Sequence, residues 1–227
     1  MMDDHETTEA EPTLDDLAER LDTEGMVGFT QRFHDDLRQG FDAINSERYP
    51  WLDDLRKAPW SGVLCLGMGG SAAGGDFLAA LTAHDGGCPV VVHRGYTLPA
   101  WFDATWLVLA TSHSGNTEET VAATEAALKM EATVVVIATG GVLAGLPELS
   151  PRCYLVPTVG GQPPRTAFGH IFSRQVAVLE HLGLLTPQAA DQREAMLQRL
   201  AANNEHFDVL AQPCLLYTSD AADDSAC

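Results

Sequence analysis

The stretch Trp106–Thr120, WLVLATSHSGNTEET, indicates how this 227-residue chain is built. Its first five residues are mostly apolar, and they lead directly into the polar segment Ser112–Thr117 and then into a helical pattern. A short apolar run of this kind is typical of a strand that is covered on both faces. Several hydroxyl groups follow the strand just before a helix begins, and this arrangement predicts a loop that holds a phosphate.

Other segments repeat this combination of an apolar strand followed by a helix. With Trp106–Ala110, the further apolar runs predict five strands, the other four being Gly62–Gly67, Pro89–His93, Thr133–Ala138 and Cys153–Pro157. Helical patterns fill intervals between or after them, at Ser71–His84, Asn116–Met130 and Thr166–Leu182. This alternation predicts an α/β fold, in which a doubly wound five-stranded parallel sheet is flanked by helices.

The flanking regions have a different character. Residues 1–60 predict an N-terminal helical segment with two helices between Thr13 and Ile44, followed by a connection at Pro50–Pro59. Phe29, Phe33, Leu37 and Phe41 recur every four residues, which places them on one helix face. The sheet domain is expected over residues 61–185, and a further helix over Gln188–Leu210 leads out of it.

The overall charge excludes several kinds of partner. The formal net charge is −19 and the estimated isoelectric point is 4.5. Nucleic acids and anionic membranes both require positive potential, so neither is expected as a partner. No apolar run approaches the roughly 20 residues of a membrane span, and the acidic N-terminus does not resemble a secretory signal. The five cysteines form no Cys-x-x-Cys pair, which favours a reducing, cytoplasmic location.

Two loops carry the residues that suggest a binding site. The first is GMGGSAAGGDF at Gly67–Phe77, and the second is SHSGNT at Ser112–Thr117. Ligands of such sheets bind at the carboxyl ends of strands, where helix N-termini offer unpaired N–H groups. Glycines allow the ligand to approach the backbone, and serine and threonine add donors without charge. The predicted phosphate ligands are Gly69, Gly70, Ser71, Ser112, Ser114 and Thr117.

Each loop also has an ordinary structural explanation. Glycine turns and hydroxyl caps are frequent in α/β proteins, and Asn116 with Glu119 fits a helix capping box. A nucleoside triphosphatase is not expected, because its phosphate loop needs a lysine before the serine and here Gly70 precedes Ser71. The segment GMGGSA does fit a weak dinucleotide fingerprint. Arg94 after the second strand could meet the extra phosphate of NADP, so an NADP-binding Rossmann domain stays an alternative.

Three segments taken together resemble a known family. GMGGSAAGGDF, SHSGNTEETV and GGQPPRTAFG are similar to motifs of the bifunctional phosphoglucose/phosphomannose isomerases, which have the sugar isomerase (SIS) fold. The resemblance implies a hexose 6-phosphate ligand, held through its phosphate by the residues named above. It implies conversion of glucose 6-phosphate or mannose 6-phosphate to fructose 6-phosphate through an enediolate, whose charge Arg165 stabilises. It implies no cofactor and no metal, and a homodimer for the full-length protein.

The same resemblance implies that part of the enzyme lies elsewhere. In this family the base is a glutamate and the ring-opening group a histidine, and both follow the first SIS domain. Residues 186–213 would then lead toward a second SIS domain, and the chain would lack its catalytic base. Residues 214–227 are expected to be a non-native tail, because AQPCLLYTSDAADDSAC resembles a translated sequencing adapter.

Four other titratable residues near the loops are not expected to act as the base. His113 should turn away from the pocket, His170 should pack on the following helix, and Glu118 and Glu119 should face solvent. A regulatory SIS module that only binds a sugar phosphate is a second alternative. Its usual DNA-binding helical domain does not fit the acidic first 60 residues.

Overall fold

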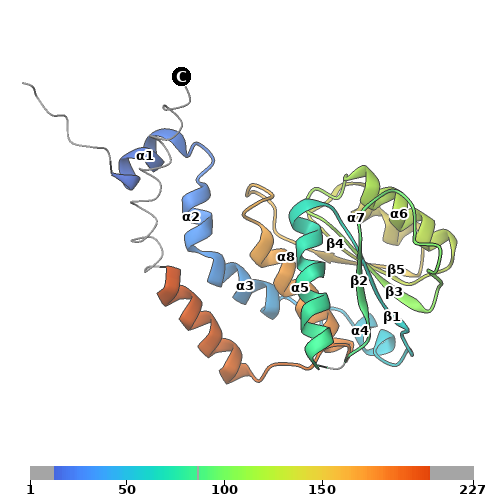
Figure 1. The fold of residues 1–227 in the computed structure, drawn as a ribbon. Coiled ribbons are helices and arrows are strands. Elements are labelled where there is room, and N and C mark those ends of the chain that lie inside the picture. Colours follow the sequence, from blue (N-terminus) through green and yellow to red (C-terminus); the bar gives the residue numbers. More distant parts are fainter. Residues whose placement is uncertain (1–12, 86, 205–227) are drawn as a thin grey trace, which may run out of the picture.

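Five parallel strands form one sheet in the order β2-β1-β3-β4-β5 (Figure 1). The structure is a computed structural model and describes residues 13–85 and 87–204. Both β1 and β4 are buried along their whole length, as their valine- and leucine-rich sequences predict. The strands are β1 (Gly62–Leu66), β2 (Val90–His93), β3 (Trp106–Ser112), β4 (Val134–Ala138) and β5 (Cys153–Pro157).

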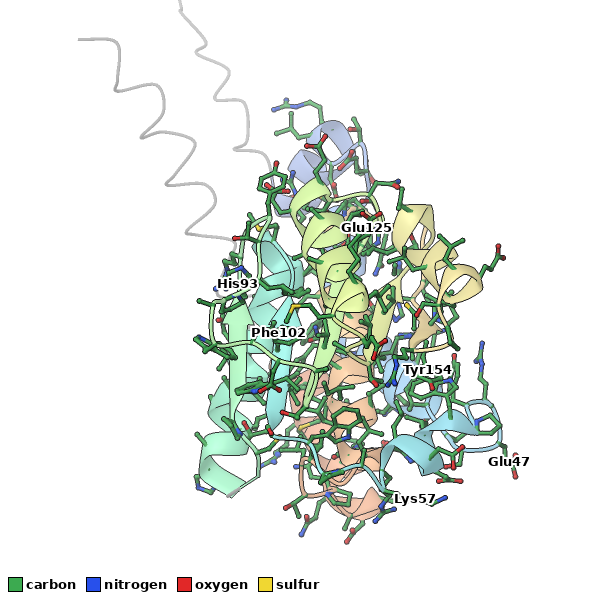
Figure 2. All side chains as sticks on the ribbon, turned by 90° about the vertical axis from the view of Figure 1, so that its right-hand side faces the viewer. Glu47, Lys57, His93, Phe102, Glu125 and Tyr154 are labelled. Atoms are coloured by element: carbon green, nitrogen blue, oxygen red, sulfur yellow. The ribbon has the colours of Figure 1, made fainter. Side chains whose placement is uncertain are left out.

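Helices cover both faces of this sheet, which confirms the predicted doubly wound fold. On one face lie α6 (Glu118–Lys129) and α7 (Gly141–Leu149); Figure 2 views the molecule from the side of α6, which carries Glu125. On the other face α5 (Gly69–Asp85) packs against α8 (Phe168–His181), and α3 (Phe33–Asp42) packs on α8 (Figure 1). Successive strand residues point to opposite faces, so the molecule has two hydrophobic clusters. Val63 belongs to one cluster and Leu64 to the other.

The helices outside the sheet differ from the sequence prediction. Three helices replace the two expected between Thr13 and Ile44: α1 (Leu14–Leu21), α2 (Met26–Gln31) and α3. Gly25, with a φ of 68°, separates the first two in a conformation that favours glycine. The connection predicted at Pro50–Pro59 contains a short helix, α4 (Trp51–Leu55). Helix α7 was not predicted, because Gly140, Gly141 and Pro147 obscure its helical pattern.

The last described helix covers residues 190–204 and agrees with the start of the helix predicted at Gln188–Leu210. The remainder of that segment and the tail at 214–227 lie outside the described residues.

Among the residues that are described, no helix is long and apolar enough to cross a membrane. Cys65, Cys88 and Cys153 are free thiols, and burial raises the pKa of both Cys65 and Cys153 to about 12.

Candidate functional site

The strand order places the site where the chain reverses its direction across the sheet. From β1 the chain moves outward to β2, and from β3 it moves the other way to β4 and β5. The loops that follow β1 and β3 therefore meet at a topological switch point, where α/β proteins bind ligands. They approach closely: a Cβ atom on Gly67 would lie 3.1 Å from the carbonyl oxygen of Thr111.

A pocket of about 690 Å³ lies at this edge of the sheet. It brings together six of the seven predicted site residues, including Arg165, from three separate parts of the chain. Gly69 is the exception: it does not line the pocket but begins α5 with a φ of 51°. The lining residues are Met68, Gly70, Ser71, Ala73, Ser112, His113, Ser114, Thr117, Pro164, Arg165 and Phe168.

Three helix N-termini contribute to this pocket. Gly70 and Ser71 belong to the first turn of α5, Thr117 is the N-cap of α6, and Phe168 begins α8. Helix N-termini carry unpaired N–H groups and a partial positive charge, so all three favour a bound anion. No carboxylate is among the lining residues, although the chain as a whole is strongly acidic. The pocket is therefore suited to a phosphate.

The hydroxyl groups after β3 have different environments. The Ser112 Oγ atom lies 2.9 Å from Thr117 Oγ1 and accepts a hydrogen bond of 3.1 Å from the Gly115 N–H. Ser112 is only 1% exposed, so its hydroxyl also orders the loop. Ser114 is exposed at the pocket, and its Oγ accepts a 3.2 Å hydrogen bond from the Asn116 N–H. Ser114 is thus the hydroxyl that a ligand reaches most directly.

Asn116 does not form the predicted capping box. Helix α6 has Thr117 as its N-cap, and no side chain caps its first turn. The Asn116 Oδ1 atom instead accepts a 3.0 Å hydrogen bond from the N–H of Val142, at the start of α7. The prediction was wrong because α7 supplies a donor that the local sequence around Asn116 does not reveal. This contact ties the loop after β3 to the next crossover helix.

Arg165 lies in a tight turn that ends at α8. The N–H of Thr166 donates to the carbonyl oxygen of Pro163 at 3.0 Å, and the Ala167 N–H donates to that of Pro164 at 3.3 Å. These bonds give the constrained backbone that the proline-rich segment predicts. The Arg165 side chain is exposed at the pocket and forms no ion pair or hydrogen bond with the described residues. Its charge is therefore available to a ligand.

His113 is among the residues that line the pocket, and the sequence predicts that its side chain turns away from the ligand. The residue follows the last residue of β3, Ser112, and precedes the turn at Gly115, whose φ is 71°. The His113 ring interacts with the backbone of Val159, and its Nε2 atom is buried without a hydrogen-bond partner. Burial lowers the pKa of His113, so the imidazole is neutral near pH 7.

The other three residues dismissed as bases lie outside the pocket lining. His170 is on α8, as predicted, and is buried, but its Nε2 atom forms a polar contact of 3.2 Å with Asp36 Oδ1 on α3. Burial lowers the pKa of His170 and raises that of Asp36. Glu118 is exposed and Glu119 is half-buried. Arg94, on which the dinucleotide alternative depends, is paired with Asp76 of α5.

Comparison with known proteins finds relatives for part of the chain. No protein-family profile matches the chain. A bifunctional phosphoglucose/phosphomannose isomerase from Caldicellulosiruptor bescii is 37% identical over 145 residues, which are 64% of this chain and 42% of that protein. The chain's curated relatives are bifunctional phosphoglucose/phosphomannose isomerases. The chain spans less than half the length of the curated relatives it matches.

Solved structures show the same fold. Tagatose-6-phosphate ketose/aldose isomerase from Escherichia coli superposes with a TM-score of 0.59 at 20% identity, over 78% of this chain and 52% of that one. The Vibrio vulnificus NanR protein complexed with ManNAc-6P superposes with a TM-score of 0.50 at 19% identity, over 88% of this chain and 74% of that one. At these identities the likeness concerns the fold alone.

Proposed function

We propose that this chain binds a hexose 6-phosphate and takes part in converting glucose 6-phosphate or mannose 6-phosphate to fructose 6-phosphate. The observation that carries the proposal is one pocket in which three helix N-termini, several hydroxyls and the free Arg165 guanidinium meet. The name shared by the curated relatives supports the same reaction. We further propose that the protein is cytoplasmic and that its full-length form is a homodimer.

The phosphate group would occupy the end of the pocket formed by the two loops. Ser71, Ser114 and Thr117 would donate hydroxyl hydrogen bonds, Ser112 would hold the loop in place, and the first N–H groups of α5 would add backbone donors, with Gly69 opening that turn. Hydrogen bonds to a charged group contribute about 1.5–3 kcal/mol each. A dianionic sugar phosphate is therefore favoured over the free sugar by several such bonds.

The reaction moves a proton between C2 and C1 of the open-chain sugar. Negative charge develops on the enediolate, and a fixed cation such as Arg165 is most useful where charge develops. Proton abstraction also needs a base within hydrogen-bond reach of C2. No carboxylate lines the described pocket, so we assign the base and the ring-opening group to residues outside 13–204. In this proposal the helix at 190–204 leads toward a second SIS domain that holds them.

A second candidate is a module that binds a sugar phosphate without converting it. The NanR protein, which shares this fold, is described as a complex with ManNAc-6P, and this supports sugar-phosphate binding as a use of the fold. The acidic N-terminal helices of this chain do not suit a nucleic-acid partner. Both candidates place the ligand in the same pocket, so they differ in turnover and not in binding.

A thermal-shift panel tests the binding that both candidates require. Fructose 6-phosphate, glucosamine 6-phosphate, free fructose and NADP+ would each be added to the purified chain. A ligand at about 100 times its Kd stabilises a protein by about 2.7 kcal/mol, which corresponds to roughly 5–10 °C for a domain of this size. We expect such a shift with fructose 6-phosphate and none with free fructose. A larger shift with NADP+ would instead support the dinucleotide alternative.

A further inference from the structure

A second pocket, of about 460 Å³, lies beside the carboxyl end of β5. It is bounded by the end of α3, by α8 and by the backbone that follows β5, and it shares no residue with the sugar-phosphate pocket. Thr158 opens the same loop that carries Arg165 at its far end, so one segment of backbone borders both pockets. Its lining residues are Gln39, Asp42, Ala43, Arg48, Pro157, Thr158, Val159 and Arg174.

Arg174 supplies a buried positive charge to this pocket. The residue is only 4% exposed, and its Nε and Nη1 atoms donate to the carbonyl oxygens of Pro157 and His170, at 3.2 and 2.9 Å. Among the described residues no carboxylate lies within ion-pair distance of its guanidinium. A buried cation is costly unless a negative charge compensates it. The carboxylate of Asp36 acts on this charge at longer range and is itself in contact with His170 at 3.2 Å. Arg174 therefore has no direct anionic partner among the described residues.

Arg48 adds a second positive charge. It is exposed on the same pocket and is close enough to Arg174 for the two charges to repel each other. Asp42 also lines the pocket, but its exposed carboxylate forms no ion pair with either arginine among the described residues. Two cations against one solvated carboxylate make this pocket locally positive on a chain with a net charge of −19.

Thr158 adds an unused hydrogen-bond donor. The residue is 8% exposed, and its Oγ1 atom is buried without a hydrogen-bond partner. Its position is fixed, because the Thr158 N–H donates to the carbonyl oxygen of Ala138 at 3.0 Å. Buried hydroxyl groups are normally hydrogen-bonded, so an unpaired one beside two arginines requires an explanation.

We propose that this pocket binds a small oxyanion of the phosphate type, held by the guanidinium groups of Arg48 and Arg174 and by the Thr158 hydroxyl. The forked donors of a guanidinium match the geometry of phosphate oxygens. One bound oxyanion would compensate the buried charge of Arg174, relieve its repulsion with Arg48 and satisfy the hydroxyl. This site is independent of the sugar-phosphate pocket and does not rest on the proposed function.

The test is a titration of the 15N-labelled chain with inorganic phosphate at constant ionic strength. Backbone amide signals of Ala43, Thr158 and Val159 report on the oxyanion pocket, and those of Gly70 and Gly115 report on the sugar-phosphate pocket. We expect saturable shifts of the first set that persist when fructose 6-phosphate saturates the second. Because the two sets are read separately, failure of one proposal is distinguishable from failure of the other.

Three variants test which side chains bind the phosphate. Thr158→Val keeps the shape of the side chain and removes only the hydroxyl, so phosphate should bind at least about tenfold more weakly. In phosphate-free buffer the same variant should be no less stable than the wild type, since its hydroxyl has no partner to lose. Arg48→Ala should weaken phosphate binding about threefold, the scale of an exposed ion pair. Arg152→Ala, which removes an exposed arginine elsewhere, should have no effect.

Either of two results would overturn the proposal. One is phosphate-induced shifts confined to Gly70 and Gly115. The other is a set of three variants that all titrate like the wild type, which would mean that neither the Thr158 hydroxyl nor the Arg48 guanidinium holds the anion. Thr158→Val keeps the test decisive if Arg48→Ala fails to fold.

Discussion

The two serine hydroxyls that follow β3 have different roles, since one orders the loop and the other faces the pocket. Ser112 is buried and bridges Thr117 and the Gly115 N–H, whereas Ser114 is exposed at the pocket. Removing Ser114 should mainly remove a ligand contact, and removing Ser112 should also loosen the loop. The two effects reinforce each other, because an ordered loop loses less entropy when a ligand binds.

The double variant Ser112→Ala, Ser114→Ala should therefore bind fructose 6-phosphate at least about tenfold more weakly, a loss of about 1.4 kcal/mol. Isothermal titration calorimetry measures this affinity. Ser61→Ala is a suitable control, because Ser61 is exposed before β1, at the opposite edge of the sheet. Unchanged affinity in the double variant, with an intact circular-dichroism spectrum, would exclude the loop from the site.

The His113 ring gives a second prediction at this scale, which concerns pH. Burial holds the pKa of His113 below its ordinary value of 6.5, so the folded state binds its proton less readily than the unfolded state. The stability that depends on the neutral ring is present above pH 6.5 and is lost as the pH falls through that value toward the lower pKa of the folded state.

Urea unfolding at pH 7.5 and at pH 5.5 would measure this effect. We expect the free energy of unfolding of the wild type to fall more between these two pH values than that of His113→Gln, which carries no titratable ring. Equal losses in the two proteins would show that His113 does not contribute to the acid sensitivity.

Among the elements, the loop after β3 and the start of α7 pack unusually closely. A Cβ atom on Gly115 would lie 1.8 Å from the carbonyl oxygen of Gly140, and the φ of Gly115 is 71°. The Gly115 carbonyl oxygen accepts a 3.0 Å hydrogen bond from the Leu143 N–H. The phosphate loop therefore depends on a glycine that lets it contact α7 directly.

Gly115→Ala should lower the free energy of unfolding by more than about 1–2 kcal/mol, the cost of the left-handed conformation alone, because the clash adds to it. Gly145→Ala is the matched control: Gly145 lies exposed within α7, and apart from its chain neighbours and its own helix backbone no atom lies within 4 Å of its added Cβ. That control should be more stable by about 0.5–1 kcal/mol. Chemical denaturation measures both, and equal effects would contradict the close packing described here.

For the molecule as a whole, the composition of the sugar-phosphate pocket determines what it can do alone. It offers helix ends, hydroxyls and one free cation, which are means of binding and of stabilising negative charge. It offers no carboxylate, and His113 is the one neutral titratable base among its lining residues. Binding and proton transfer are therefore expected to separate in this chain.

We predict that the 227-residue chain binds fructose 6-phosphate but converts it to glucose 6-phosphate far more slowly than a complete enzyme. A general acid or base contributes about 10²–10⁴-fold to the rate, so the loss of both should remove several orders of magnitude. A coupled assay of glucose 6-phosphate formation measures the rate. A turnover of more than about 1 per second, in the usual range of enzymes, would show that a base lies within the chain, with His113 the first residue to substitute.

Much of this architecture follows from the sequence by itself. Apolar runs at Gly62–Gly67 and Trp106–Ala110 predict buried strands, because short runs without a polar face are typical of strands that are covered on both sides. The structure has strands there, at Gly62–Leu66 and Trp106–Ser112. Parallel strands end at one edge of a sheet, so the order of the segments along the chain is enough to place the polar loops after β1 and β3 together. Arg165 could be added only through the family resemblance, because a loop residue distant in sequence has no periodic pattern.

Other features were decided only by tertiary structure. The N-terminus of α8 reaches the pocket, Asn116 bonds to Val142 and not to its own helix, and His113 joins the pocket wall. The pocket of Arg48, Thr158 and Arg174 likewise joins residues from three separate segments. The physical reason is common to all of them. Periodicity reports which side of an element is buried, whereas these contacts depend on how elements far apart in the chain pack against one another.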